Sequence, residues 1–181
     1  LGHSFEPMEA GCWIIDKQLK TNLEGLLEYT YHPVNVPLDI PFENRYFKGY
    51  RRTNGDVGIR NEIWIIPTVG CVNGIANQLA ENLRKETDEQ GVDVIKAFPH
   101  NYGCSQLGDD HENTKKILRD MVKHPNAGGV LIVGLGCENN QPDVFREFIG
   151  EYDEERVKFL VTQQVEGDEV EIGMQLLREI Y

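Results

Sequence analysis

Three cysteines occupy equivalent places in three successive segments of the chain. Cys71, Cys104 and Cys137 each follow a glycine, and each comes after an apolar run and before a segment with helical spacing. Glycine permits backbone angles that other residues avoid, and it lets a ligand approach the main chain. The free amides of a following helix lower the pKa of a thiol, and thiolates suit soft metal ions. The pattern therefore predicts a metal site, whereas the alternative is that each cysteine is only a small buried hydrophobe.

Polar side chains that could bind a substrate or move a proton accompany these cysteines. A carboxamide follows each of them, as Asn73, Gln106 and Asn139, and it can donate to an oxyanion or accept from a hydroxyl. His100 and His111 bracket the middle cysteine, and histidine titrates near neutral pH. We therefore expect proton transfer by His100 or His111 and substrate contacts from the three carboxamides.

A cluster of arginines lies just ahead of the first long apolar run, in "YRRTNGDVGIRNE" over residues 50–62. Arginine offers a planar fork that matches a carboxylate, so Arg51, Arg52 and Arg60 are candidates for holding an acidic ligand. The alternative is a solvated turn with Asn-Gly at its tip.

Composition excludes some partners. The 181 residues include 18 Lys and Arg against 30 Asp and Glu, and the formal net charge is −12. Such a charge repels phosphate backbones, so we expect no nucleic acid partner. The mainly apolar stretches are far shorter than the roughly 20 residues of a membrane helix, so we also expect no membrane span. Reduced cysteines and the lack of a signal-peptide pattern favour the cytoplasm.

Four apolar runs have the composition of strands that are buried on both faces. They cover residues 62–69, 92–98, 128–135 and 157–163, and a segment with helical spacing follows each of them. Four such units in succession predict an α/β fold, a Rossmann-like parallel sheet with helices on both faces. Loops that follow parallel strands meet at one edge of the sheet, where ligands bind, so we expect the thiols to converge there.

Each predicted helix carries an apolar stripe that would pack on the sheet. The stripes contain Ile75, Leu79 and Leu83 in the first helix; Ile117, Leu118, Met121 and Val122 in the second; Val144, Phe145 and Phe148 in the third; and Ile172, Leu176, Leu177 and Ile180 in the last. Asp109 or Asp110 is expected to cap the second helix.

The first part of the chain lacks this regularity. Three prolines in residues 32–44 predict an extended arm, because each removes a backbone donor and biases its predecessor toward extended geometry. A short apolar core at residues 13–15 could be the last strand of a small β domain. We therefore divide the chain into residues 1–48, the end of an N-terminal β domain plus an extended linker, and residues 49–181, an α/β domain.

Three long strings carry a family resemblance, namely "YRRTNGDVGIRNEIWIIPTVGCVNGIA", "YGCSQLGDDHENT" and "HPNAGGVLIVGLGCENNQ". Together they closely resemble the altronate dehydratase family, which also includes galactarate dehydratase and the large subunit of sulfolactate sulfo-lyase. The resemblance implies that this chain holds the middle region of a longer dehydratase. A C-terminal region that is missing here would complete the protein, and the whole dehydratase would form a homodimer.

The resemblance also implies a reaction, the removal of water from D-altronate to give 2-keto-3-deoxy-D-gluconate with iron(II). On this hypothesis Cys71, Cys104 and Cys137 serve the metal, His100 or His111 moves the proton, and the three arginines hold the carboxylate of a small anionic sugar acid. Galactarate dehydratase and sulfolactate sulfo-lyase activities remain alternatives, as does an isolated dimerisation module that is inactive by itself.

Overall fold

A four-stranded parallel β-sheet lies at the centre of the computed structural model, which describes residues 46–181. Its strands are β3 (Glu62–Pro67), β4 (Val94–Ala97), β5 (Ala127–Gly134) and β6 (Val157–Val161). They match the four predicted apolar runs, so the predicted parallel sheet is confirmed. The predicted N-terminal β strand and almost all of the predicted arm lie outside the described residues.

The strands are arranged in the order β4, β3, β5, β6, and every neighbouring pair is parallel. From β3 the chain runs first to β4 on one side and then to β5 on the other side of β3, so the direction of winding reverses there. In doubly wound sheets, the crevice beyond the carboxyl ends of the strands at such a reversal is where ligands bind.

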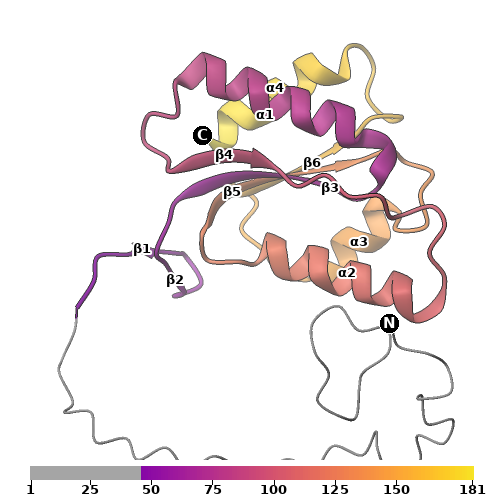
Figure 1. Cartoon of the computed structure of the whole chain (residues 1–181), viewed down its shortest axis with the longest axis horizontal. Helices are drawn as coiled ribbons and strands as arrows, with labels where there is room; N and C mark the ends of the chain where they lie inside the picture. Colours follow the sequence, from indigo (N-terminus) through magenta and orange to yellow (C-terminus); the bar gives the residue numbers. More distant parts are fainter. Residues whose placement is uncertain (1–45) are drawn as a thin grey trace, which may run out of the picture. The chain divides into compact units, whose positions relative to one another are not determined.

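Two layers of helices cover the sheet (Figure 1). Helices α1 (Asn73–Thr87) and α4 (Glu169–Ile180) pack on one face, and α2 (Gly108–Val122) and α3 (Pro142–Ile149) pack on the other. The placement of α1 opposite α2 and α3 follows from the strand order, because right-handed crossovers that run in opposite directions place their helices on opposite faces.

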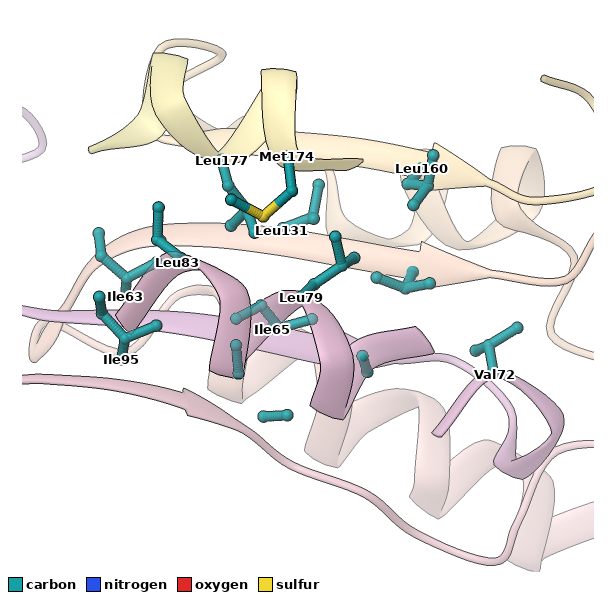
Figure 2. Packing of buried hydrophobic residues seen from close by; sticks show 14 of the residues in the cluster. Ile63, Ile65, Val72, Leu79, Leu83, Ile95, Leu131, Leu160, Met174 and Leu177 are labelled. Atoms are coloured by element: carbon teal, nitrogen blue, oxygen red, sulfur yellow. The ribbon is translucent and has the colours of Figure 1, made fainter. Parts of the chain in front are cut away.

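Alternate side chains of each inner strand pack into two separate hydrophobic cores, one on each face of the sheet. Ile63 and Ile65 of β3 join the cluster under α1 and α4, where they meet Leu79, Leu83 and other apolar side chains (Figure 2). Trp64 lies in the second cluster, under α2 and α3. Because successive side chains of a strand point to opposite faces, an unbroken apolar run is what a strand covered on both sides requires.

A small antiparallel hairpin precedes the sheet. Its strands are β1 (Tyr50–Arg51) and β2 (Val57–Gly58), and Gly55 in the connecting turn has a φ of 92°. A left-handed backbone of this kind favours glycine, so the predicted Asn-Gly turn is confirmed.

Two predicted core positions are on the surface. Ile117 of α2 is 61% exposed and Val144 of α3 is 51% exposed, because these helices turn Leu118 and Phe145 toward the sheet instead. Within residues 46–181, no helix is both long enough and apolar enough to span a membrane.

The predicted cap of α2 is wrong. The helix begins at Gly108, so both aspartates lie inside it, and its N-cap is Leu107, which makes no side-chain capping hydrogen bond. Asp109 and Asp110 lie instead in the first turn, where their charges interact favourably with the helix dipole.

Candidate functional site

The three predicted thiols all lie at the carboxyl edge of the sheet, and we call Cys71, Cys104 and Cys137 the thiol rim. Cys71 is in the short 3-10 helix η2 (Gly70–Val72) after β3, Cys104 is in the loop 98–107 after β4, and Cys137 is in the loop 135–141 after β5. All three are exposed, and none of them forms a disulfide within the described residues. The alternative that they are buried hydrophobes is therefore wrong.

The loop 98–107 crosses the end of β3 on its way from β4 to α2, and close backbone contacts hold it there. The amide of Gly70 donates to the carbonyl of Tyr102 at 2.9 Å. Gly103 has a φ of 125°, and a Cβ atom at this position would lie 2.8 Å from the Val69 side chain. On its other side the loop meets residues 135–141, where the Asn139 amide donates to the Gly103 carbonyl at 3.3 Å.

These contacts bring the thiols into each other's electrostatic range. Although Cys104 is exposed as a residue, desolvation of its thiol raises its pKa, and the neighbouring Cys71, Cys137 and Glu138 raise it further. Cys71 raises the pKa of the Cys104 thiol in two ways, through its charge and as a hydrogen-bond partner. The expectation that a helix N-terminus would favour the thiolate is therefore wrong for Cys104, because desolvation of the thiol, and after it the adjacent negative groups, raise its pKa.

A buried carboxylate lies beneath the thiol rim. Glu138 is 1% exposed, and it accepts hydrogen bonds from Thr68 Oγ1 at 2.6 Å, from the Gly136 amide at 2.6 Å and from the Leu135 amide at 3.1 Å. It thereby joins the end of β3 to the turn that carries Cys137. This residue was not among the predicted site residues, although a glutamate between two apolar segments in "GLGCENN" is the signal that could have identified it.

Two of the three predicted carboxamide side chains form hydrogen bonds with main-chain atoms. Asn73 donates to the carbonyl of His100 at 2.8 Å and accepts from its amide at 3.3 Å. Asn139 donates to the carbonyls of Gln106 at 3.0 Å and Cys104 at 3.4 Å. Both side chains therefore hold the loop 98–107 in place.

Other amides near the thiol rim are unsatisfied. Gln106 Oε1 is buried without a hydrogen-bond partner in the described residues, and so are both side-chain polar atoms of Asn140, which is 1% exposed. Buried polar atoms without partners are rare in folded proteins, and they mark places where a water, an ion or a ligand completes the structure. Gln163, from the loop after β6, donates to the Cys137 sulfur at 3.6 Å.

The two predicted histidines have different surroundings. His100 Nδ1 accepts from the Tyr102 amide at 3.2 Å, and its Nε2 lies 2.8 Å from the Pro67 carbonyl. Since an amide must donate and a carbonyl must accept, the ring is neutral with its proton on Nε2, and both nitrogens are occupied. His111 lies in the first turn of α2, half-buried, and the described residues supply no hydrogen-bond partner to its ring.

The structure does not bring the predicted arginines to the thiol rim. Arg52 donates from Nε to the carbonyl of Pro125 at 2.7 Å, just before β5 begins, and Arg60 pairs with Glu62 at the first residue of β3. Arg51 is exposed in the hairpin strand β1. They lie at the amino edge of the sheet, and the six residues of β3 separate the two edges by about 20 Å.

The thiol rim suits a soft metal ion by its chemistry, since thiolates are the preferred ligands of such ions. Among residues 46–181, however, no three His, Cys, Asp or Glu side chains are grouped as a ready-made metal site. Binding would require the exposed thiols to turn toward a common point. The geometry therefore offers three adjacent thiols at the topological reversal, above a buried carboxylate.

Known protein families and curated proteins include clear relatives of this chain. The family model for D-galactarate dehydratase/Altronate hydrolase, second domain, matches residues 49–181. Altronate dehydratases from Escherichia coli (strain K12) and Bacillus subtilis (strain 168) are each 50% identical to the chain over 182 residues, covering all of it. The chain spans 37% and 36% of the lengths of these two relatives.

A more distant relative is named as a subunit of a sulfo-lyase. The (2R)-sulfolactate sulfo-lyase subunit beta of Chromohalobacter salexigens is 33% identical over 93 residues, which are 51% of this chain and 22% of that protein. No solved structure gives a significant match.

Proposed function

Because the chain belongs to the D-galactarate dehydratase/altronate hydrolase family, we propose that it is part of a hydro-lyase that converts D-altronate to 2-keto-3-deoxy-D-gluconate and water. Identity of 50% over the whole chain to two altronate dehydratases supports this substrate over the alternatives. The chain corresponds to little more than a third of those enzymes, so the reaction belongs to the whole protein, with a further region of the same chain completing the site.

The observation that carries the proposal is the gathering of three exposed thiols at the reversal of the sheet. Cys71, Cys104 and Cys137 would hold the iron(II) ion. When bound, such an ion acts as a Lewis acid that stabilises the negative charge developing on the acid during proton removal and helps the hydroxyl leave. Glu138 holds the Cys137 turn in register with β3 and adds negative charge beside the thiols.

Proton transfer falls to His111 in this proposal. Its ring is half-buried in the first turn of α2, the helix that directly follows the Cys104 loop, and no bond within the described residues must break before it can accept a proton. His100 would instead fix the loop 98–107, because both of its ring nitrogens bind the backbone.

The carboxylate of the substrate needs a partner other than the three arginines. A six-carbon acid bound at the thiol rim cannot also reach the amino edge of the sheet, about 20 Å away. Gln106 Oε1 and both side-chain polar atoms of Asn140, which are buried without a partner in the described residues, are polar groups that this chain offers near the thiols. The further region of the protein would supply the cationic contacts.

We also propose that the whole protein works as a homodimer in the cytoplasm. The three cysteines are free and exposed, a state that persists in a reducing compartment.

A product assay on the whole protein tests the reaction. Altronate, galactarate and sulfolactate are each supplied with iron(II), and formation of 2-keto-3-deoxy acid or sulfite is followed. We expect keto-acid formation from altronate, whereas sulfite release from sulfolactate without turnover of altronate would assign the sulfo-lyase reaction instead. Turnover of none of the three would reject the proposal.

The metal assignment needs its own variants. Cys71→Ser, Cys104→Ser and Cys137→Ser should each weaken iron(II) binding at least about tenfold, because each removes one thiolate ligand. Cys12→Ser is the matched control, since this cysteine lies outside the repeated pattern. Unaltered iron affinity in all three rim variants would remove the thiol rim from the mechanism.

A further inference from the structure

A cavity of about 470 Å³ opens at the amino edge of the sheet, at the opposite end of the strands from the thiol rim. It lies between the hairpin turn, the end of α2 and the loop that precedes β6. Its volume is within the range of small-molecule sites. Its charged lining residues are Arg52, Lys123, Arg156, Asp56, Glu151 and Asp153.

Two arginines in this wall are held in fixed positions by backbone carbonyls. Arg52 donates to the carbonyls of Pro125 at 2.7 Å and Arg60 at 3.1 Å, and to Asn61 Oδ1 at 2.9 Å. Arg156 donates to the carbonyls of Ala127 at 2.7 Å and Val122 at 3.0 Å. Each guanidinium has five N–H donors, so both arginines keep donors for a ligand after these bonds are made.

The charges of the two arginines are not neutralised by direct ion pairs. Burial lowers the pKa of Arg156 and the nearby Arg52 lowers it further, so the two guanidinium groups repel each other, whereas the charges of Asp153 and Asp56 raise this pKa and offset part of that repulsion. Neither forms an ion pair within residues 46–181. Asp153 attracts Arg156 through its charge without forming an ion pair, and its oxygens accept from Thr53 Oγ1 and from the Glu155 amide, both at 3.0 Å. A small anion between the arginines would relieve the repulsion.

We propose that this cavity is a second ligand site, for a small hydroxy-carboxylate whose carboxylate lies between Arg52 and Arg156. Hydroxyl groups of the same ligand would donate to Asp56 and Glu151 on the cavity wall. The three carboxylates in the lining favour a ligand with one negative charge and several hydroxyls over a phosphate, whose additional charge they would repel. The site shares no residue with the thiol rim and does not depend on the proposed reaction.

Binding of D-gluconate to the metal-free chain tests this site, with mannitol as the uncharged probe and inorganic phosphate as the competing anion. Calorimetry gives the affinity, and amide chemical shifts give the location. We expect saturable binding of one gluconate per chain, with shifts at Gly55 and Tyr152 rather than at Cys71 and Cys137, and no binding of mannitol.

Variants identify the residues responsible. Arg156→Gln should weaken gluconate binding at least about tenfold, because a charge-assisted contact is lost. Lys123→Glu, on an exposed side chain of the same wall, should weaken binding about threefold or more and serves if Arg156→Gln does not fold. Lys85→Gln is the matched control, since Lys85 is 70% exposed on α1 and pairs only with Glu81 in the described residues.

Three results would overturn the inference. The first is the absence of saturable gluconate binding, and the second is binding that the folded Arg156→Gln or Lys123→Glu variant leaves unchanged. The third is phosphate binding as tightly as gluconate, which would make the cavity a general oxyanion site. Because no turnover is measured, failure of the dehydration assay leaves these outcomes unaffected.

Discussion

Glu138 is the residue that joins the thiol rim to the sheet, and its replacement should be costly. In Glu138→Leu, the Thr68 hydroxyl and the amides of Leu135 and Gly136 lose their acceptor in a buried place. We expect the free energy of unfolding to fall by roughly 2–5 kcal/mol, since each buried unsatisfied donor costs about 1–3 kcal/mol. Urea unfolding measures the loss.

The control for Glu138→Leu is Glu147→Leu, which makes the same change on an exposed position of α3. It should alter the free energy of unfolding by no more than about 0.5 kcal/mol. Equal effects of the two substitutions would mean that the hydrogen bonds of Glu138 contribute nothing specific.

The Cys104 thiol should respond to removal of its neighbours. A raised pKa leaves less thiolate at a given pH, so alkylation of Cys104 in the metal-free chain should have its midpoint above that of an ordinary cysteine, whose pKa is about 8.5. Cys71→Ser removes one of the groups that raise this pKa, so the midpoint should move to lower pH. Alkylation with iodoacetamide between pH 7 and 10, quantified for each cysteine by mass spectrometry, checks the direction.

The prediction for Cys104 has a clear control in Cys12→Ser, which changes a cysteine outside the repeated pattern. A midpoint that does not move in Cys71→Ser, or that moves equally in Cys12→Ser, would contradict coupling between the two thiols.

At the scale of single residues, sequence reasoning located the thiols but not the role of most polar side chains. The cysteines were predictable because their position after a strand places them at one edge whatever the side-chain details. Asn73 and Asn139 bind the backbone instead, and Arg52 lies at the far edge, because such roles depend on tertiary contacts that sequence spacing does not record.

Among the elements, the loop 98–107 depends on Gly103. In Gly103→Ala, the new methyl would meet Val69 at 2.8 Å in a backbone conformation that alanine rarely adopts. We expect the free energy of unfolding to fall by roughly 2–5 kcal/mol from the combined clash and backbone strain. Thermal and urea unfolding both measure this change.

Gly74→Ala provides the contrast to Gly103→Ala. Gly74 lies in the first turn of α1, and a Cβ there would meet nothing within 4 Å. Alanine has the higher helix propensity, so the same substitution should here stabilise the protein by up to about 1 kcal/mol. Destabilisation of similar size at both positions would show that the local geometry at Gly103 is unimportant.

The strands were predictable as elements because β-branched runs that are apolar on both faces admit few other interpretations. The start of α2 was not, because Leu107 caps it without a side-chain hydrogen bond and so leaves no polar signal in the sequence. Ile117 was assigned to the core for a related reason: a stripe four residues wide does not say which of its edges faces the sheet.

For the whole molecule, the two cores should unfold together. Leu79→Ala removes a fully buried side chain from the core under α1 and α4, so we expect a loss of about 2–5 kcal/mol. Trp64 reports on the other core, and in a Trp13→Phe background it is the sole tryptophan. Its fluorescence should follow the same urea transition as far-ultraviolet circular dichroism, both before and after Leu79→Ala, because β3 belongs to both cores.

Phe145→Ala is the matched substitution in the core on the other face of the sheet. It should lower the urea midpoints of the fluorescence transition and of the circular dichroism transition equally. A Trp64 transition that stays in place while the circular dichroism transition shifts in Leu79→Ala would show that the layers unfold independently.

Strand order is the part of the fold that the sequence did not reveal. Apolar stripes such as Leu79 with Leu83 identify a helix that packs on a sheet, but they do not record on which side the next strand is added. The order β4, β3, β5, β6 sets which loops become neighbours, and so it determines whether the thiols meet.

The path of residues 98–107 over the end of β3 has a consequence for how the protein tolerates change. This segment bridges two layers of helices and is anchored on both flanks, at Gly70 and at Asn139, so added length there would separate Cys104 from both other thiols at once. Residues 88–93 lead from α1 into β4 at the opposite edge of the sheet, so added length there would not move any of the three thiols. Among natural relatives, insertions and deletions should therefore be common in residues 88–93 and rare in residues 98–107.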